Sequence, residues 1–440
     1  MTRTAIHFSD VLSRVIEALW REPFPEKLPK PLLIRDIFGR VSVGFDATRA
    51  DFTEWTSRLD SILDGFSPFI GQPPTLFSDD LFEPELIFSD AAIVDFVDPI
   101  SGRSVRLLER QITGQDWSLL PRQAEPGDVP QLSFFGLKGG VGRSTALSIL
   151  AYELAKKGKR VLLIDLDLES PGLSGLLLPR ERQVEFGVVD WLIEDSVGQS
   201  DSILEQIVSS SPLADSTPGE IRVVSAMGNS DCDYVAKLSR IYSEVSIEGR
   251  SQRFSERISR LVQVLKIKES PEVVLIDSRA GLHDLAGLSI VSLSTASYLF
   301  ATNGAQAWDG LRALFSYWQR RPVIARGVRE RLKLVSALFP ESDQVRRTRE
   351  FLERAHSLFA ETLYDEVAPG PTEVSAREEP FNFSLNDTEG PHFPLRINWN
   401  SRFQEFDPLL IPLGLFNEYE IRAAYGEFLD SALQSIEDVL

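Results

Sequence analysis

The chain has 440 residues, of which 43% are hydrophobic and 25% are charged, and its formal net charge is −19. This composition is typical of a folded globular protein long enough for two domains, and it excludes wholesale disorder. The single cysteine, Cys232, excludes an internal disulfide, and the net negative charge opposes binding to nucleic acid backbones and anionic membranes.

The first 24 residues carry apolar side chains at helical spacing, interrupted by Asp10, Arg14 and Glu17. This pattern predicts an amphipathic helix, whereas a signal peptide has an unbroken apolar core. No later run reaches the roughly 20 apolar residues of a membrane span. Together with the single cysteine, these features lead us to expect a cytoplasmic protein that does not engage the membrane.

Short β-rich runs follow, with one helical stretch between them. The strand-like segments are 32–45, 91–97 and 104–110, and the helical segment is 50–66. We expect a small α+β domain of unknown role over residues 1–120. Three prolines and a glycine within "LLPRQAEPGDVPQ" (119–131) then predict a linker over 121–130 and a second domain over 131–440.

In the second domain, apolar runs alternate with long amphipathic stretches. The runs are 131–137, 160–167, 221–226, 272–279, 297–302, 332–339 and 395–399. This alternation predicts an α/β fold with a mostly parallel, twisted sheet and helices on both faces. Ligands of such sheets bind beyond the carboxyl ends of the strands. The polar, proline-rich segment 369–394 is expected to be a surface excursion.

The stretch "LKGGVGRST" (137–145) joins the first of these strands to a helix. Glycines let successive backbone N–H groups turn toward phosphate oxygens, and the helix N-terminus adds partial positive charge. A serine directly after the basic residue is placed to ligate Mg²⁺. The predicted phosphate-binding residues are Gly139, Gly140, Val141, Gly142, Arg143, Ser144 and Thr145.

Acidic residues end two of the later strands. Asp165 and Asp167 lie in "LLIDLD", and because strand residues two apart point the same way, their side chains share one face. Asp277 ends "VVLID" and is followed by Gly281. Carboxylates at strand ends can hold the Mg²⁺ hydration shell and orient an attacking water, and a loop glycine N–H can sense a γ-phosphate.

Together, "KGGVGRST", "LLIDLD" and "VLIDSRAG" resemble the deviant Walker A ATPases of the ParA/MinD class, within the SIMIBI group of P-loop proteins. Further similarity lies in 186–192 and 221–241. The resemblance covers residue 131 to the C-terminus and leaves about the first 125 residues unexplained. It implies ATP and Mg²⁺ as cofactors, and a switch in which ATP closes a sandwich homodimer and hydrolysis opens it.

The resemblance also implies roles for single residues. Lys138 is the signature lysine that reaches across the dimer interface to the partner's nucleotide, and Asp167 positions the attacking water. Ser144 ligates the metal, Asp165 supports the metal site, and Asp277 is the Walker B carboxylate. The base is not decided by the motifs, although Asn303 and Asn398 follow candidate strands where a base-reading side chain would lie.

Arg143 departs from the family pattern, which has lysine at this position, and a variant group of these ATPases shares the KGGVGR loop. A guanidinium is wider and planar and prefers bidentate contacts, so it places its charge differently from an ammonium. We therefore expect nucleotide binding with slow hydrolysis, with Arg143 in the catalytic set beside Lys138 and Asp167. The alternative is a nucleotide-gated interaction module that does not hydrolyse.

The absence of certain residues excludes some branches of the family that the chain resembles. One cysteine cannot hold an iron–sulfur cluster, and the tail has only Tyr419 and Tyr425 in place of the tyrosine cluster of bacterial tyrosine kinases. The last helix carries Asp430, Glu437 and Asp438, unlike a basic lipid-binding tail.

Residues 319–354 hold ten Lys/Arg against five Asp/Glu and are the one region suited to nonspecific DNA contact. A DNA-partitioning ATPase is thus a third, weaker reading. We favour a protein partner engaged through the N-terminal domain. An ATPase switch with an appended domain would suit bacterial conflict or phage defence, which is a hypothesis drawn from the architecture.

Overall fold

The computed structural model describes residues 6–21, 23–123, 125, 127–229, 233–247, 250–367, 380–403, 406–410 and 418–439. The chain forms two compact units. The first consists of Met1–Leu119 and Ser316–Arg326, and the second of Leu120–Phe315 and Gly327–Leu440. Residues 316–326 thus group with the first unit although they lie inside the range predicted for the second domain, and nothing in the sequence singled them out.

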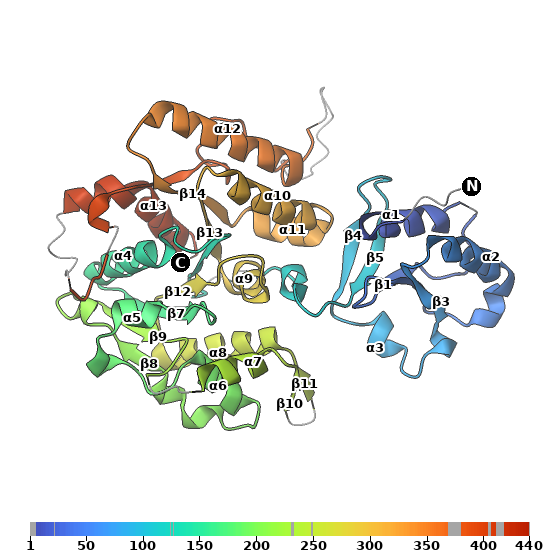
Figure 1. The fold of residues 1–440 in the computed structure, drawn as a ribbon, viewed down its shortest axis with the longest axis horizontal. Helices are drawn as coiled ribbons and strands as arrows, with labels where there is room; N and C mark the ends of the chain where they lie inside the picture. The colour runs from blue at the N-terminus through green and yellow to red at the C-terminus, as the bar shows by residue number, and fades with distance from the viewer. Residues whose placement is uncertain are drawn as a thin grey trace. The chain divides into compact units, whose positions relative to one another are not determined.

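The first unit is built on a five-stranded sheet in the order β3-β2-β1-β5-β4 (Figure 1). The β1 strand pairs antiparallel to β2 and parallel to β5, so the sheet is mixed. Helices α1 and α2 bury their apolar sides in one core with residues of this sheet, which is an α+β arrangement. The elements are α1 (Phe8–Leu19), β1 (Leu32–Arg35), β2 (Val41–Phe45), α2 (Thr53–Leu63), β3 (Ile70–Phe77), α3 (Glu85–Phe88), β4 (Ile93–Val97) and β5 (Ser104–Glu109).

The β3 strand is absent from the sequence-based prediction. Its sequence, IGQPPTLF, contains two prolines, which lack the N–H that a central strand must donate. The structure places β3 at the edge of the sheet, where prolines are tolerated.

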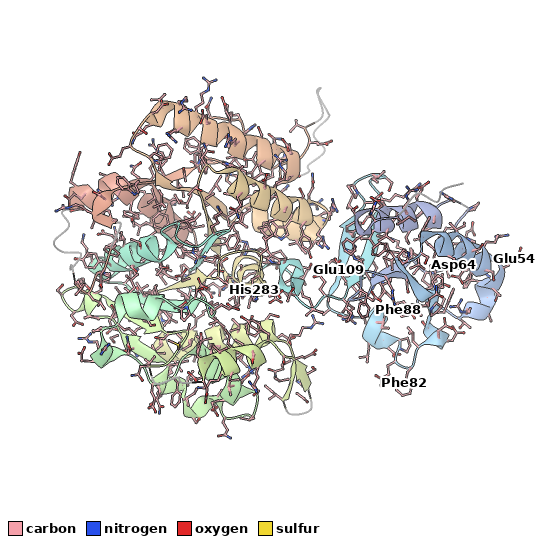
Figure 2. The ribbon with its side chains drawn as sticks, in the orientation of Figure 1. Glu54, Asp64, Phe82, Phe88, Glu109 and His283 are labelled. Carbon is pink, nitrogen blue, oxygen red and sulfur yellow. The ribbon has the colours of Figure 1, made fainter. Side chains whose placement is uncertain are left out.

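Residues 316–326 are held in the first unit by polar and aromatic contacts. Arg321 Nη2 lies 2.7 Å from Glu109 Oε2, and Glu109, labelled in Figure 2, also pairs with Arg35. The Trp318 indole donates to the carbonyl oxygen of Trp117 at 3.2 Å. Trp117 itself is buried.

The second unit contains an eight-stranded sheet in the order β15-β14-β13-β6-β12-β7-β9-β8. Its neighbouring strands are parallel except for β8, which runs antiparallel to β9. The strands are β6 (Gln131–Gly136), β7 (Arg160–Leu166), β8 (Val208–Ser210), β9 (Glu220–Val224), β12 (Val273–Ser278), β13 (Ala296–Ala301), β14 (Leu332–Phe339) and β15 (Leu395–Asn398). A separate hairpin joins β10 (Val245–Ile247) and β11 (Arg250–Gln252).

Helices surround this sheet (Figure 1). They are α4 (Arg143–Lys156), α5 (Leu173–Leu177), α6 (Val188–Asp195), α7 (Tyr234–Ile241), α8 (Phe254–Glu269), α9 (Asp284–Leu288), α12 (Gln344–Thr362) and α13 (Glu418–Glu437), with α10 (Ala305–Gln319) and α11 (Pro322–Arg329) extending into 316–326. Every residue of β6, β12 and β13 is buried, so the central strands are covered on both faces. This confirms the predicted mostly parallel α/β fold.

The last helix, α13, is part of the core of the second unit. The Phe428 ring lies 6.0 Å from that of Phe134 on β6 and 5.5 Å from that of Tyr298 on β13, measured between centroids. Its apolar side is therefore occupied by protein contacts. None of the helices in the described ranges is long and apolar enough to cross a membrane.

The basic region 319–354 has most of its charge engaged within the protein. The arginines bonded to acidic side chains or to backbone oxygens are Arg321, Arg329, Arg331, Arg346, Arg349 and Arg354. Arg346 illustrates the pattern, with Asp343 at 2.5 Å and Glu350 at 2.6 Å. Pairing of this kind lowers the positive field that a phosphate backbone would meet. Of the predicted surface excursion 369–394, residues 369–379 lie outside the described ranges.

Candidate functional site

The loop between β6 and α4 has the conformation that its glycines allow. Gly140 and Gly142 have φ values of 74° and 81°, in the left-handed region that other residues rarely adopt. A Cβ on Gly136 would come within 3.1 Å of Val141 Cγ2, so the loop turns tightly there. A Cβ on Gly139 would meet nothing within 4 Å, which leaves that side of the loop open. Because the 14-residue helix α4 begins at Arg143, backbone donors and the helix N-terminus face the same place.

The strand-end carboxylates lie at the same edge of the sheet. β7 and β12 are neighbours, and Asp165 is the register partner of Asp277. Both strands run parallel to β6, so their carboxyl ends lie beside the loop that follows β6. The predicted elements of the site are thereby brought together.

Arg143, at the start of α4, lies among these carboxylates. Its side chain is 7% exposed, and Nη2 donates to Asp167 Oδ2 at 3.1 Å. Nε lies 3.9 Å from Asp277 Oδ1, which is too far for a hydrogen bond. Nη1 is buried and has no hydrogen-bond partner among the described residues. Both N–H groups of Nη1 are thus left unused.

Asp165 has a structural role in this arrangement. Its two carboxylate oxygens accept the backbone N–H groups of Asp167 at 3.0 Å and Leu173 at 3.2 Å, which orders the turn after β7. Burial, and after it the charge of Asp277, raises the pKa of Asp165 to about 8. Burial likewise raises the pKa of Asp277 and of Asp167, although Arg143 opposes both shifts.

Ser144 and Asp277 fit a magnesium ion. Ser144 Oγ donates to Asp277 Oδ2 at 2.7 Å, while Asp277 Oδ1 is buried without a hydrogen-bond partner in the described part of the chain. A hydroxyl and a carboxylate in contact are the pair that holds Mg²⁺ in P-loop proteins. Asp165 keeps its oxygens for backbone bonds, and no cluster of three or more His, Cys, Asp or Glu in the described ranges is arranged to hold a metal. The ion would thus rest on Ser144 and Asp277, completed by water and phosphate.

The remaining predicted residues make fewer side-chain contacts with the rest of the site. Lys138 is exposed, and none of the described residues forms an ion pair or hydrogen bond with its ammonium group. Gly281 has a φ of 86°, and its N–H donates to the carbonyl oxygen of Gly136 at 3.0 Å. A phosphate contact through Gly281 would therefore replace an existing backbone bond. Thr145 is half-buried in the first turn of α4.

Two charged residues beside the site were missed by the sequence analysis. Glu169 and Arg279 each follow a strand-end aspartate, Asp167 and Asp277, by two residues. Opposite charges at the same offset on neighbouring strands were the signal that could have found them. Their side chains form an ion pair in the structure.

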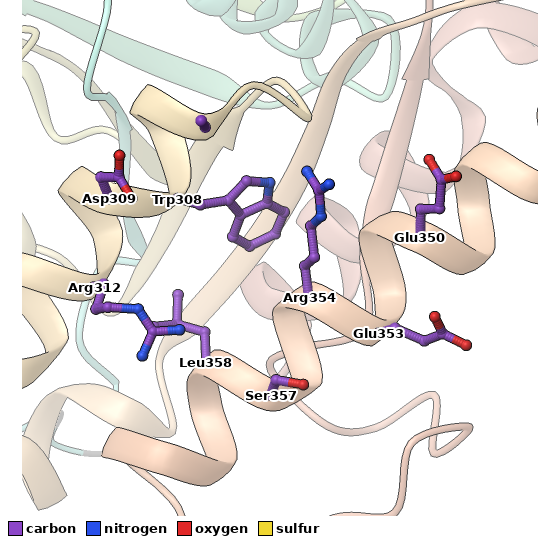
Figure 3. A pocket seen from close by; sticks show the side chains of 9 residues that line it. Trp308, Asp309, Arg312, Glu350, Glu353, Arg354, Ser357 and Leu358 are labelled. Atoms are coloured by element: carbon purple, nitrogen blue, oxygen red, sulfur yellow. The ribbon is translucent and has the colours of Figure 1, made fainter.

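The candidate base-reading asparagines are used within the fold. Asn303 Oδ1 accepts from the Trp308 indole at 3.0 Å and from Arg354 at 3.1 Å, and Asn398 Nδ2 donates to the carbonyl oxygen of Ala423. Trp308 and Arg354 line a cavity of about 450 Å³ between α10 and α12, shown in Figure 3. This cavity contains none of the loop or strand-end residues.

Comparison with known proteins gives matches to this region. Residues 131–320 match a family model described as an AAA domain. The chromosome-partitioning ATPase Soj of Thermus thermophilus is 46% identical over 56 residues, which make up 13% of this chain. The match spans only 22% of that relative.

Solved structures are similar at lower identity. A ParA family ATPase from Chlorobium tepidum TLS is 13% identical, with a TM-score of 0.43, over 69% of this chain and 99% of that one. The septum site-determining protein MinD from Pyrococcus horikoshii, complexed with Mg-ADP, is 20% identical, with a TM-score of 0.34, over 50% of this chain and 72% of that one.

Proposed function

We propose that this chain is a slow Mg-ATP-hydrolysing switch of the ParA/MinD type, because residues 131–320 match a model described as an AAA domain and 56 residues are 46% identical to the chromosome-partitioning ATPase Soj. The observation that carries the proposal is the assembly of Arg143, Ser144, Asp167 and Asp277 at the loop, with a buried donor and a buried acceptor left unpaired. Unpaired buried polar atoms cost free energy, and a ligand that meets both would recover it.

Each residue has a distinct part in this proposal. The loop N–H groups and the start of α4 would bind the phosphates, and Ser144 and Asp277 would hold Mg²⁺, which would supply positive charge at the outer phosphates. Asp167 orients the attacking water once Arg143 no longer bonds to it. Asp165 keeps Asp167 in place, because it accepts the N–H of that residue.

Arg143 accounts for the slow turnover that we propose. Its guanidinium must leave Asp167 and turn toward the phosphates before the carboxylate can orient water. A buried ion pair of this kind resists separation, because each partner loses a compensating charge. The rate of hydrolysis is therefore limited in two ways: Arg143 must first rearrange, and its guanidinium places charge differently from a lysine ammonium.

Dimerisation and the partner complete the proposed switch. Exposed Lys138 is free to reach the nucleotide of a second copy, so Lys138→Ala is expected to retain ATP binding and to lose ATP-dependent dimers in analytical ultracentrifugation. The dimer would control a protein partner bound through the N-terminal domain, in a bacterial conflict or defence system. A Lys138→Ala variant that still dimerises with ATP contradicts the assignment of this lysine.

The test of hydrolysis is phosphate release from Mg-ATP by the wild-type protein, beside an Asp167→Ala variant prepared in parallel. We expect slow release by the wild type and a loss of at least about a hundredfold in the variant, the range that a water-activating group contributes. Nucleotide binding, measured by fluorescence with labelled ATP, should stay within a few-fold. Equal rates in the two proteins would refute the role of Asp167.

A second candidate is a nucleotide-gated interaction module that binds ATP without hydrolysing it. The bond between Arg143 and Asp167 favours it, because an arginine that keeps this bond after nucleotide binds leaves no carboxylate for the water. Nucleotide binding without phosphate release in the test above would select this candidate. DNA partitioning is disfavoured by the paired arginines of 319–354.

A further inference from the structure

Four side chains gather beside Asp167, outside the phosphate loop. Glu169 forms an ion pair with Arg279 Nη1 and accepts a hydrogen bond from the Tyr242 hydroxyl. His283 Nε2 lies 3.8 Å from Glu169 Oε1, and the rings of His283 and Tyr242 pack edge to face at 5.4 Å. Figure 2 labels His283 in the middle of the second unit.

These residues come from the two segments that carry the proposed catalytic groups. Glu169 follows Asp167 by two residues after β7, and Arg279 lies between Asp277 and Gly281 after β12. β7 and β12 are neighbouring strands, so one ion pair joins the two segments at the point where they leave the sheet. Both partners are largely buried, with side-chain exposures of 20% and 27%.

The pair also acts on Asp167 electrostatically. Burial raises the pKa of Asp167, and the charges of Glu169 and Arg279 shift it in opposite directions. Removing either partner therefore leaves the other charge uncompensated beside the carboxylate. Glu169 Oε2 has no hydrogen-bond partner among the described residues, so the carboxylate is held through Oε1 alone.

A further contact extends the arrangement to α7. The Tyr234 hydroxyl donates to the carbonyl oxygen of Leu168 at 2.5 Å, between Asp167 and Glu169. Tyr242 follows the last residue of α7. The segment after β7 is thus held by a side chain at each end of this helix.

We propose that Glu169 and Arg279 are positioning residues that hold the segments of Asp167 and Gly281 together, so that the two respond to the γ-phosphate as one unit. This inference rests on the proposed function. Gly281 donates to Gly136 in this structure, so a nucleotide that draws its N–H away moves Arg279, and through Glu169 it moves Asp167. Neither Glu169 nor Arg279 needs to touch the nucleotide for this effect.

The experiment compares Glu169→Gln, Arg279→Gln and the double variant with the wild type, using Mg-ATP and Mg-ADP. Asp215→Asn is the matched control, because Asp215 forms an exposed ion pair with Arg182 at 2.7 Å. We expect each single variant to lose roughly tenfold to a hundredfold in kcat, because displacement of a reacting group by about 1 Å costs up to a hundredfold. KM for ATP and the melting temperature should change little.

The double variant decides whether the two residues act together. We expect its kcat to fall no further than that of either single variant, since the first substitution already breaks the ion pair. Arg279→Lys keeps the charge and should recover part of the rate. Losses that multiply in the double variant, an unchanged kcat, or a fall in nucleotide affinity equal to the fall in rate would each overturn the inference.

A second readout separates this inference from the proposed function. If the wild type binds ATP without releasing phosphate, hydrolysis fails as a function and the ratio of ATP affinity to ADP affinity becomes the measure. Glu169→Gln should then lower that ratio, while Asp215→Asn leaves it unchanged. An unchanged ratio in Glu169→Gln would overturn the inference.

Discussion

Two buried arginine–aspartate sites in the described part of the second unit differ in how completely their hydrogen bonds are satisfied. Arg257 on α8 is fully buried, and it bonds to Asp195 at 2.9 Å and to the carbonyl oxygens of Leu192 and Ile241. Arg260 adds two bonds of 2.7 Å to the same carboxylate. At the loop, by contrast, Arg143 makes one hydrogen bond and keeps a buried N–H without a partner in the described part of the chain.

The pKa values of the carboxylates record the same difference. Burial raises the pKa of Asp195, but the hydrogen bonds from Arg260 and Arg257 lower it further, so this pKa lies below its usual range. At the loop, burial raises the pKa values of Asp167 and Asp277 despite Arg143. A satisfied buried site stabilises the fold, whereas an incompletely satisfied one is prepared for a ligand that supplies the missing partners.

The largest effect is expected at the satisfied site. Arg257→Ala leaves Asp195 short of a buried partner, so it should lower the unfolding free energy by about 3–5 kcal/mol. Denaturant unfolding of wild type, Arg257→Ala and Arg143→Ala measures the difference. Arg143→Ala should cost much less, and equal losses at the two sites would remove the distinction between them.

Ligand binding should stabilise the site at the loop. At a Mg-ATP concentration of about 100 times Kd, mass action adds about 2.7 kcal/mol to the unfolding free energy. Thermal melting with and without Mg-ATP measures this, and Asp277→Asn should reduce the gain because it removes the charge that faces Mg²⁺. A full gain in Asp277→Asn would show that the ion rests elsewhere.

Replacing the buried arginine by lysine should change the rate of hydrolysis at the loop site and the stability at the Asp195 site. Arg143→Lys leaves Asp167 without its guanidinium partner and restores a compact charge, so phosphate release should rise roughly tenfold, or about 1.4 kcal/mol in barrier. Its melting temperature should change little, whereas Arg257→Lys should melt lower because lysine cannot make the same set of bonds. A slower Arg143→Lys enzyme would mean that the arginine has become the better catalyst in this loop.

A pH dependence of stability is expected at Asp165 and at Asp195, with opposite sign at the two residues. The pKa of Asp165 is about 8 in the folded chain and about 3.9 when unfolded, so the folded state binds the extra proton between these values. The contribution of Asp165 to the unfolding free energy is therefore complete below about pH 4 and is lost as the pH rises toward 8. Asp195, with its lowered pKa, instead loses stability as pH falls below the unfolded value.

Thermal melting from pH 5 to pH 8.5 without nucleotide tests this prediction. Asp165→Asn should flatten the fall in melting temperature with rising pH, by on the order of a few degrees at the alkaline end. Asp195→Asn should leave that slope as it is in the wild type. An unchanged slope in Asp165→Asn would show that this carboxyl does not titrate in the range.

Much of the fold followed from local patterns. The glycine loop, the strand ends at Asp165 and Asp277 and the alternating helices predicted the parallel α/β sheet, because each depends on spacing within a short segment. The β3 strand was missed because its prolines suggest a loop, and only its place at the sheet edge makes them compatible. The grouping of residues 316–326 with the first unit depends on contacts between residues far apart in sequence, such as Trp318 with Trp117, which are 201 residues apart.

By itself, the sequence determined which groups the strand ends carry: a glycine-rich loop, a serine hydroxyl directly after Arg143 and three carboxylates. Only the tertiary structure decided how they are connected. It placed Arg143 on Asp167, committed both oxygens of Asp165 to backbone bonds and joined Glu169 to Arg279. The physical reason is that residue types and spacing define which bonds are available, whereas burial and the register of β7 against β12 select the bonds that form.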